Sequence, residues 1–168
     1  MVLHKGSREI HLLFLGRGHT AGDVVVWLPQ QKVVATGDLM HGLLPFIGDA
    51  YPLEWAPTLD RLREVEFDRV IPGHGGVQQG KQRLARFRNY IEELTALVEK
   101  GMAAGQTLEQ MQKEIVPASL RSLQVENFRE QVTAELAKLK LDYPATPAES
   151  FEKSVRTNVG EVYRRLKT

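Results

Sequence analysis

Three short glycine-rich segments constrain this chain most, because each carries a histidine or an aspartate beside glycine. They read GRGHTAGD, ATGD and PGHGG, and they place His19, Asp38 and His74 in three separate parts of the sequence. The second and third segments directly follow apolar runs that are typical of β-strands. Glycine lets the backbone turn at the end of a strand without a Cβ clash, so the next side chain can project from the sheet edge. We therefore expect the three side chains to converge in the folded protein.

The chemistry of these three residues favours a metal site. Imidazole nitrogens and carboxylate oxygens are the ligands that a catalytic zinc ion takes when no thiolate is present, and the chain has no cysteine. The same donors also suit iron or manganese. The alternative is that each residue only serves its own loop, with Asp38 accepting from nearby amides and both histidines at surface turns. Taken together, the three glycine-flanked residues favour the metal site.

Apolar patterning predicts strands in the first part of the chain. The run from Glu9 to Leu15 alternates like a strand that is buried on most of both faces. The patterns that follow indicate, in order, a strand from Asp23 to Leu28, a turn, a strand from Lys32 to Ala35 that completes a hairpin, a loop from Leu39 to Trp55, a helix beginning at Pro57 and a strand from Phe67 to Ile71.

After the third glycine-rich segment the apolar spacing becomes helical for the rest of the chain. A long helix is expected up to Gly101, and its basic run from Lys81 to Arg88 is expected to be a solvated face. Thr107 and Thr146 each stand three residues before Gln or Glu, which is the pattern of a capping box, and so predict two further helix starts. Another helix is expected over the apolar positions from Val125 to Leu139.

Composition disfavours several classes of function. The 22 basic and 21 acidic residues give a formal net charge of +1, so no global field would attract nucleic acid, and nucleic-acid binding is not expected. No apolar run reaches the roughly 18 to 20 residues of a membrane span, and residues 1–9 lack the apolar middle of a signal peptide. We expect a cytoplasmic chain without membrane contact, or a periplasmic one if a preceding segment carries an export signal.

Longer stretches around the three segments, GRGHTAGDVVVWLP, VVATGDLMHG and RVIPGHGG, resemble the C-terminal metal-binding motifs of the metallo-β-lactamase fold superfamily. They occur in the order and the approximate spacing of that family. The resemblance implies an α/β fold in which this chain forms the second half of an αββα sandwich, followed by a helical C-terminal extension. It places residues 1–101 in the C-terminal half of a metallo-β-lactamase-like domain and residues 102–168 in the extension.

The resemblance also implies roles for the three residues. In the family, the histidine of the first motif binds one metal ion, the aspartate bridges two ions, and the histidine of the third motif binds the second ion. Carried over to this chain, these ligands are His19, Asp38 and His74, with one or two zinc ions in the complete site. The family's H-x-H-x-D-H motif has no counterpart here, since His4 and His11 lack its spacing. We therefore expect an incomplete site with partial zinc occupancy.

Three further residues belong to the candidate site as neighbours. His41 follows Asp38 by three residues and could face the same cleft, although a loop histidine bonded to backbone or solvent is the favoured interpretation. Thr20 and Asp23 could orient His19, since metal-bound imidazoles usually give their second N–H to an oxygen acceptor. Asp23 could equally cap the turn into the strand that follows it.

Two functions from different classes follow from these observations. The first is a metal-dependent hydrolase in which a metal-bound hydroxide attacks an ester, thioester, lactone or amide carbonyl of a small-molecule substrate. Because the ligands of the H-x-H-x-D-H motif are missing, we expect the metal site to be incomplete, and catalytic activity of this chain alone is in question. The second is a non-catalytic half-domain or truncated remnant, which would pair with another copy or with a complementing N-terminal half through an uncovered sheet face.

Overall fold

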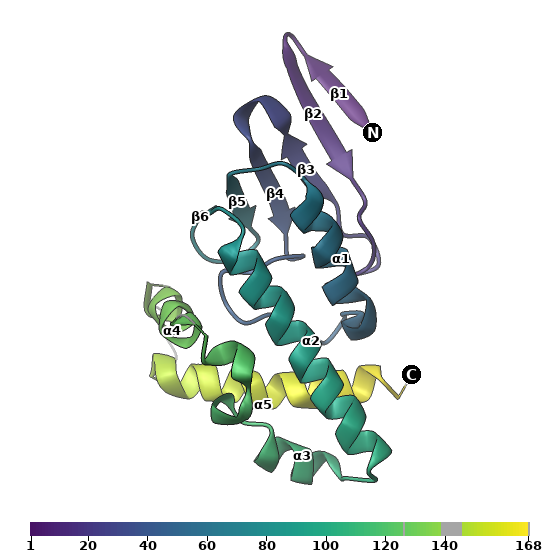
Figure 1. Cartoon of the computed structure of the whole chain (residues 1–168), viewed down its shortest axis with the longest axis vertical. Coiled ribbons are helices and arrows are strands. Elements are labelled where there is room, and N and C mark those ends of the chain that lie inside the picture. The colour runs from purple at the N-terminus through teal and green to yellow at the C-terminus, as the bar shows by residue number, and fades with distance from the viewer. Residues whose placement is uncertain (126, 139–145, 168) are drawn as a thin grey trace.

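The computed structural model describes residues 1–125, 127–138 and 146–167. Strands occupy the first half of the chain and helices dominate the second half (Figure 1). The strands are β1 (Val2–Lys5), β2 (Arg8–Leu13), β3 (Val25–Leu28), β4 (Val33–Gly37), β5 (Arg69–Pro72) and β6 (Gln78–Gln79). The α-helices are α1 (Pro52–Glu64), α2 (Gln82–Ala103), α3 (Leu108–Glu114), α4 (Phe128–Lys138) and α5 (Pro147–Arg165), and the short 3-10 helices are η1 (Pro29–Gln31), η2 (Pro117–Ser119) and η3 (Arg121–Leu123). Within the described ranges, no helix combines the length and the apolar character that a membrane crossing needs.

In the part of the chain that the structure describes, one six-stranded sheet runs in chain order from β1 to β6, and only β4 and β5 pair in parallel. The predicted hairpin is confirmed as β3 and β4, which η1 joins. Helix α1 is the crossover that a parallel pair of strands requires. Because β4 and β5 run in the same direction, the segments that carry Asp38 and His74 leave the sheet at the same edge.

One face of the sheet is buried beneath α1 and α2, which lie side by side in Figure 1. Val34 of β4 and Val70 of β5 are register partners that point into this layer, and both are fully buried. Trp55 of α1 and Phe87 of α2 are also fully buried, and their rings meet edge to face at 5.8 Å. Burying one such side chain contributes about 1.5–3 kcal/mol to the free energy of folding. The layer between the sheet and helices α1 and α2 is therefore the main core of the sheet.

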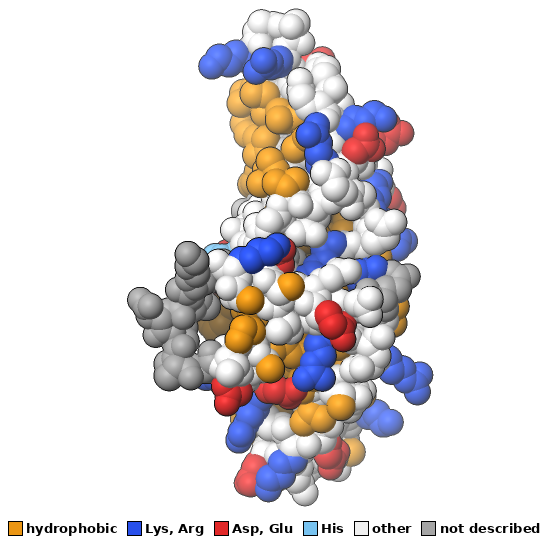
Figure 2. Space-filling model, turned by 90° about the vertical axis from the view of Figure 1, so that its left-hand side faces the viewer, with side chains coloured by type: hydrophobic (Ala, Val, Ile, Leu, Met, Phe, Trp, Pro, Cys, Tyr) orange, Lys and Arg blue, Asp and Glu red, His pale blue; other side chains and the backbone are white. Residues whose placement is uncertain are grey.

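The opposite face of the sheet is apolar but has no covering layer among the described residues. Register pairs Leu12 with Val26, Val26 with Ala35, and Ala35 with Ile71, so the four side chains share that face. None of the four is fully buried, and Ile71 is 45% exposed. Figure 2 shows hydrophobic side chains gathered over the upper part of the molecule, where the strands lie. The expectation that the strand from Glu9 to Leu15 is buried on most of both faces is therefore wrong, because the helices among the described residues cover one side of the sheet.

Some element boundaries differ from the predicted ones. Helix α1 begins at Pro52, ahead of the predicted start at Pro57, which lies inside the helix. A proline in the first turn costs no hydrogen bond, so Pro52 is the helix-starting proline. Helix α2 passes the expected stop at Gly101 and ends shortly before Gly105, whose φ of 73° is left-handed. Strands β1 and β6 escape the sequence patterns because they are short and mostly exposed.

The C-terminal helices pack onto the same core as the sheet layer. The capping boxes predicted at Thr107 and Thr146 are confirmed, and they start α3 and α5. Helix α5 crosses α2, where the Asn158 side-chain amide donates to the Tyr90 hydroxyl at 3.0 Å in a buried contact (Figure 1). Buried residues from both halves of the chain form one cluster. The division at residues 101 and 102 stays a prediction, and Leu139, the predicted end of the fourth helix, lies outside the described residues.

The packing of α5 on α2 yields a stability prediction. The substitution Tyr90→Phe leaves the buried Asn158 amide without its acceptor, so we expect the free energy of unfolding to fall by about 1–3 kcal/mol. Urea unfolding followed by circular dichroism measures the change. Tyr163→Phe, at a half-buried ring of α5, is the matched control and should change the same quantity by less than about 0.5 kcal/mol. Equal losses in the two variants would contradict the role of this contact.

Candidate metal centre

The glycine before His19 lets the first loop pack tightly against the core. A Cβ at Gly18 would lie 2.6 Å from the Leu39 side chain and 2.8 Å from the Trp55 ring, closer than real Cβ atoms approach. The His19 ring itself lies edge to face with Trp55, at 5.7 Å between centroids. The loop therefore holds His19 against α1 and the start of the loop that follows β4.

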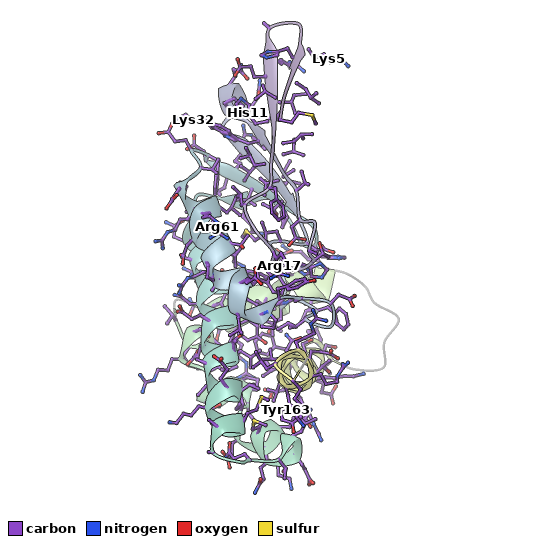
Figure 3. The ribbon with its side chains drawn as sticks, turned by 90° about the vertical axis from the view of Figure 1, so that its right-hand side faces the viewer. Lys5, His11, Arg17, Lys32, Arg61 and Tyr163 are labelled. Carbon is purple, nitrogen blue, oxygen red and sulfur yellow. The ribbon has the colours of Figure 1, made fainter. Side chains whose placement is uncertain are left out.

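Helix α1 also anchors the backbone just ahead of His19. The Thr58 hydroxyl donates to the Arg17 carbonyl at 2.7 Å, and the Arg61 guanidinium donates to the Leu15 carbonyl. Figure 3 shows Arg17 and Arg61 on the side of the molecule where this helix lies. These bonds satisfy carbonyls that have left the β2 ladder, so the chain entering the site is held at two points.

Asp38 lies where the loops after β4 and β5 pass each other. Gly37 has a left-handed φ of 53°, and its carbonyl accepts from the Gly73 amide at 2.8 Å. A Cβ on Gly73 would clash with the Asp38 carboxylate and with the Gly37 backbone. The close approach thus requires glycine at position 73, and it brings His74 beside Asp38.

The structure brings the three predicted ligands together and adds His41 to them. One ligand atom from each of His19, Asp38 and His41 lies within 4.8 Å of the other two. The Nε2 atoms of His41 and His74 each lie 3.4 Å from Asp38 Oδ1. The centroid of the His41 ring is 5.7 Å from that of the His19 ring and 5.1 Å from that of the His74 ring. Asp38 is therefore the centre of a group of three imidazoles.

The four side chains differ in their exposure. The His74 side chain is 57% exposed and the Asp38 side chain 36% exposed, whereas His41 is buried. Burial lowers the pKa of His41 to about 4, against the opposing charge of Asp38, and the nearby His74 and His19 lower it further. A hydrogen bond with the Asp38 backbone also acts on the His41 ring. His41 is thus a neutral imidazole at pH 7. Its burial excludes a hydrogen bond of Nε2 to bulk solvent, while the choice between a backbone-bonded loop histidine and a ligand stays a prediction.

The donor set fits a metal ion. Among the described residues, His41 Nε2 is a buried atom with no hydrogen-bond partner, although it points toward Asp38. A neutral imidazole nitrogen, two further imidazoles and one carboxylate are the donors that a divalent cation such as zinc binds. A buried polar atom in this position calls for a partner, and an ion at the centre of the group would supply one.

Thr20 and Asp23 form a turn beside His19. The Asp23 carboxylate accepts from the Thr20 hydroxyl at 2.7 Å and from the Thr20 amide at 3.1 Å. These contacts are the ones that the capping interpretation of Asp23 requires. A role of the pair in orienting the His19 ring stays a prediction.

Helix α2 supports the loop that carries His41. Phe87 stacks on the His41 ring, with 6.0 Å between centroids and an interplanar angle of 11°. One turn earlier, the buried Arg83 guanidinium donates to the Gly42 carbonyl, and burial lowers the pKa of Arg83 to about 10. The expectation that the basic run from Lys81 to Arg88 is a solvated face is therefore wrong for Arg83.

Helix α4 supports the loop that carries His74. The Glu135 carboxylate accepts from the Gly76 amide at 3.2 Å, while the Gln131 side chain accepts from Arg83 at 3.2 Å. The Lys138 side chain also donates a hydrogen bond to the Glu135 carboxylate. This bond, together with the one from the Gly76 amide, lowers the pKa of Glu135. Sequence reasoning missed Arg83 and Glu135, because nothing in the helical periodicity distinguishes them from other polar positions.

Comparison with known proteins relates the first part of the chain to one family. The sequence model of the metallo-beta-lactamase superfamily matches residues 3–74. A metallo-beta-lactamase type 2 from Bacillus sp. (strain 170) is 35% identical over 78 residues, which are 43% of this chain and 30% of that protein. A metallo-beta-lactamase type 2 from Bacillus cereus gives the same identity and coverage. The chain thus spans about a third of the length of these curated relatives.

A solved structure agrees with the sequence matches. The metallo-beta-lactamase from Pontibacter korlensis superposes with a TM-score of 0.50 at 28% identity, over 55% of this chain and 45% of that chain. The expected α/β fold with a helical C-terminal region is confirmed, since a mixed sheet with helices precedes α3 to α5. Residues 3–74, in the N-terminal part of the chain, are therefore similar in sequence and fold to the metallo-beta-lactamase superfamily.

Proposed function

We propose that this chain is the metal-binding part of a metal-dependent hydrolase, with His19, Asp38 and His74 as ligands. The observation that carries the proposal is the convergence of the three glycine-flanked side chains, which are far apart in the sequence, around one carboxylate. Surface loop caps have no reason to meet at one point. The match of residues 3–74 to the metallo-beta-lactamase superfamily supports the same chemistry.

The arrangement suits hydrolysis of a carbonyl compound. When bound, a divalent metal lowers the pKa of water and polarises a carbonyl oxygen. Asp38 lies near both histidines, with Oδ1 3.4 Å from His74 Nε2 and a carboxylate oxygen within 4.8 Å of a His19 nitrogen, so these three residues would hold the metal. The exposed His74 leaves this edge open to a small-molecule substrate. We propose zinc as the ion, with iron or manganese as alternatives, and an ester, thioester, lactone or amide as the substrate.

Coverage of the relatives limits what this chain does by itself. It spans 30% of the curated relatives, so ligands and pocket residues in the remainder of such proteins have no counterpart here. We therefore propose partial zinc occupancy and weak activity, or none, for these 168 residues alone. A cytoplasmic or a periplasmic location is equally compatible with this proposal.

Zinc binding tests the first proposal. We expect tag-free protein to bind zinc weakly in isothermal titration, and His19→Ala or His74→Ala to weaken the affinity at least about tenfold, since each removes a donor. His4→Ala, at an exposed histidine of β1, is the matched control and should leave the affinity unchanged. Identical affinities in all four proteins would rule out a site at this position.

The uncovered sheet face supports a second candidate function. Leu12, Val26, Ala35 and Ile71 form an apolar row across four strands on a face that the described residues do not cover. Large exposed apolar patches of this kind mark association sites. We propose as the alternative that the chain is a half-domain that associates through this face, with a second copy or with a complementing N-terminal half.

Association is tested by the molar mass in solution. Light scattering after size exclusion should give a mass above that of a single chain, and Ile71→Lys should restore the single-chain mass by placing a charge on the apolar row. Leu53→Lys, at an exposed leucine of α1, is the matched control and should not change the mass. A single-chain mass in the unsubstituted protein, with little binding of a hydrophobic dye, would refute the alternative.

A further inference from the structure

We propose that His41 is itself a metal ligand, so that His19, Asp38 and His41 form a three-donor site within this chain. The inference rests on the proposed metal-binding function and goes beyond it. The motifs that relate the chain to its family assign His19, Asp38 and His74, and they leave His41 without a role. With His41 included, the chain supplies the three protein ligands that a catalytic zinc ion normally takes.

Distances within the group agree with shared coordination. Two ligands that lie about 2.1 Å from one ion in tetrahedral geometry are about 3.4 Å apart. His41 Nε2 lies 3.4 Å from Asp38 Oδ1, which is that separation. The ligand atom of His19 lies within 4.8 Å of both, so a rotation of the half-buried His19 side chain would complete the set. His74 Nε2 lies at the same 3.4 Å from Asp38 and offers a donor to a second cation position.

The bonding state of the His41 ring agrees with a ligand role. Metal-bound histidines commonly give their second ring N–H to a backbone carbonyl or a carboxylate, which fixes the tautomer. For His41, the Asp38 backbone acts on the pKa of the ring as a hydrogen-bond acceptor would, and Nε2 has no hydrogen-bond partner among the described residues. The atom is buried, so bulk water does not satisfy it. A cation between Nε2 and Asp38 Oδ1 is the partner that this atom lacks.

Packing holds His41 in place without a metal. Phe87 stacks on one side of the ring, and Arg83 binds the Gly42 carbonyl directly after it. The Gly42 amide in turn donates to the His74 carbonyl at 2.7 Å. The ring therefore cannot swing out to solvent as an ordinary loop histidine does. A donor that is fixed in advance loses little conformational entropy when an ion binds.

The substitution His41→Phe separates a ligand from a packing residue. Phenylalanine keeps the stack on Phe87 but supplies no nitrogen, whereas Phe87→Leu removes the stack and keeps all the donors. Cobalt titration of the full chain, followed by d–d absorption, reports both affinity and coordination geometry. We expect His41→Phe to weaken cobalt binding at least about tenfold and to change the band shape, while Phe87→Leu keeps the band shape.

The outcomes distinguish this inference from the proposed function. If His19→Ala weakens cobalt binding and His41→Phe matches the unsubstituted protein in affinity and band shape, His41 is not a ligand and the proposed function stands. If none of these variants differs from the unsubstituted protein, or if that protein binds no cobalt, both fail. A loss in His41→Phe that Phe87→Leu reproduces in affinity and band shape would show a packing role and overturn the inference. Circular dichroism confirms that each variant is folded.

Discussion

The backbone contact between the loops after β4 and β5 is the constraint on which the candidate site depends. The Gly73 amide binds the Gly37 carbonyl at 2.8 Å, and the Gly42 amide binds the His74 carbonyl at 2.7 Å. Parallel pairing of the two strands sets their ends side by side, and glycine removes the side chains that would keep the loops apart. The positions of Asp38, His41 and His74 all follow from this contact.

The two faces of the sheet differ in burial because of the order of the elements along the chain. Helices α1 and α2 follow the strands and bury one face, on which Val34 and Val70 lie. The row from Leu12 to Ile71 on the other face is apolar in composition but finds no partner among the described residues. The hydrophobic effect stabilises the covered face of the sheet. On the uncovered face, apolar side chains stay exposed to water, which is unfavourable in free energy, and association would bury them. The candidate metal site lies where β4 and β5 end, in the loops that carry Asp38 and His74.

The sequence is informative where a local rule determines the structure and silent where tertiary packing does. The convergence of His19, Asp38 and His74 could be predicted because glycine, strand ends and donor chemistry are local signals. The capping boxes at Thr107 and Thr146 are local too. His41 could not be placed with the same reasoning, since the loop that carries it has no period and its burial depends on Phe87. Arg83 is buried by α4, which the basic pattern around it cannot show.

The contact of Glu135 with Gly76 ties the site to helices beyond the segment that matches the family. Residues 3–74 contain the donors, but α2 and α4 hold the loops on which the donors lie. Binding free energies between coupled events are reciprocal. An ion that is bound more tightly when α4 is docked must therefore hold α4 in place by the same amount. A cation bound at the candidate site would therefore stabilise the docked position of α4 through the contact of Glu135 with Gly76.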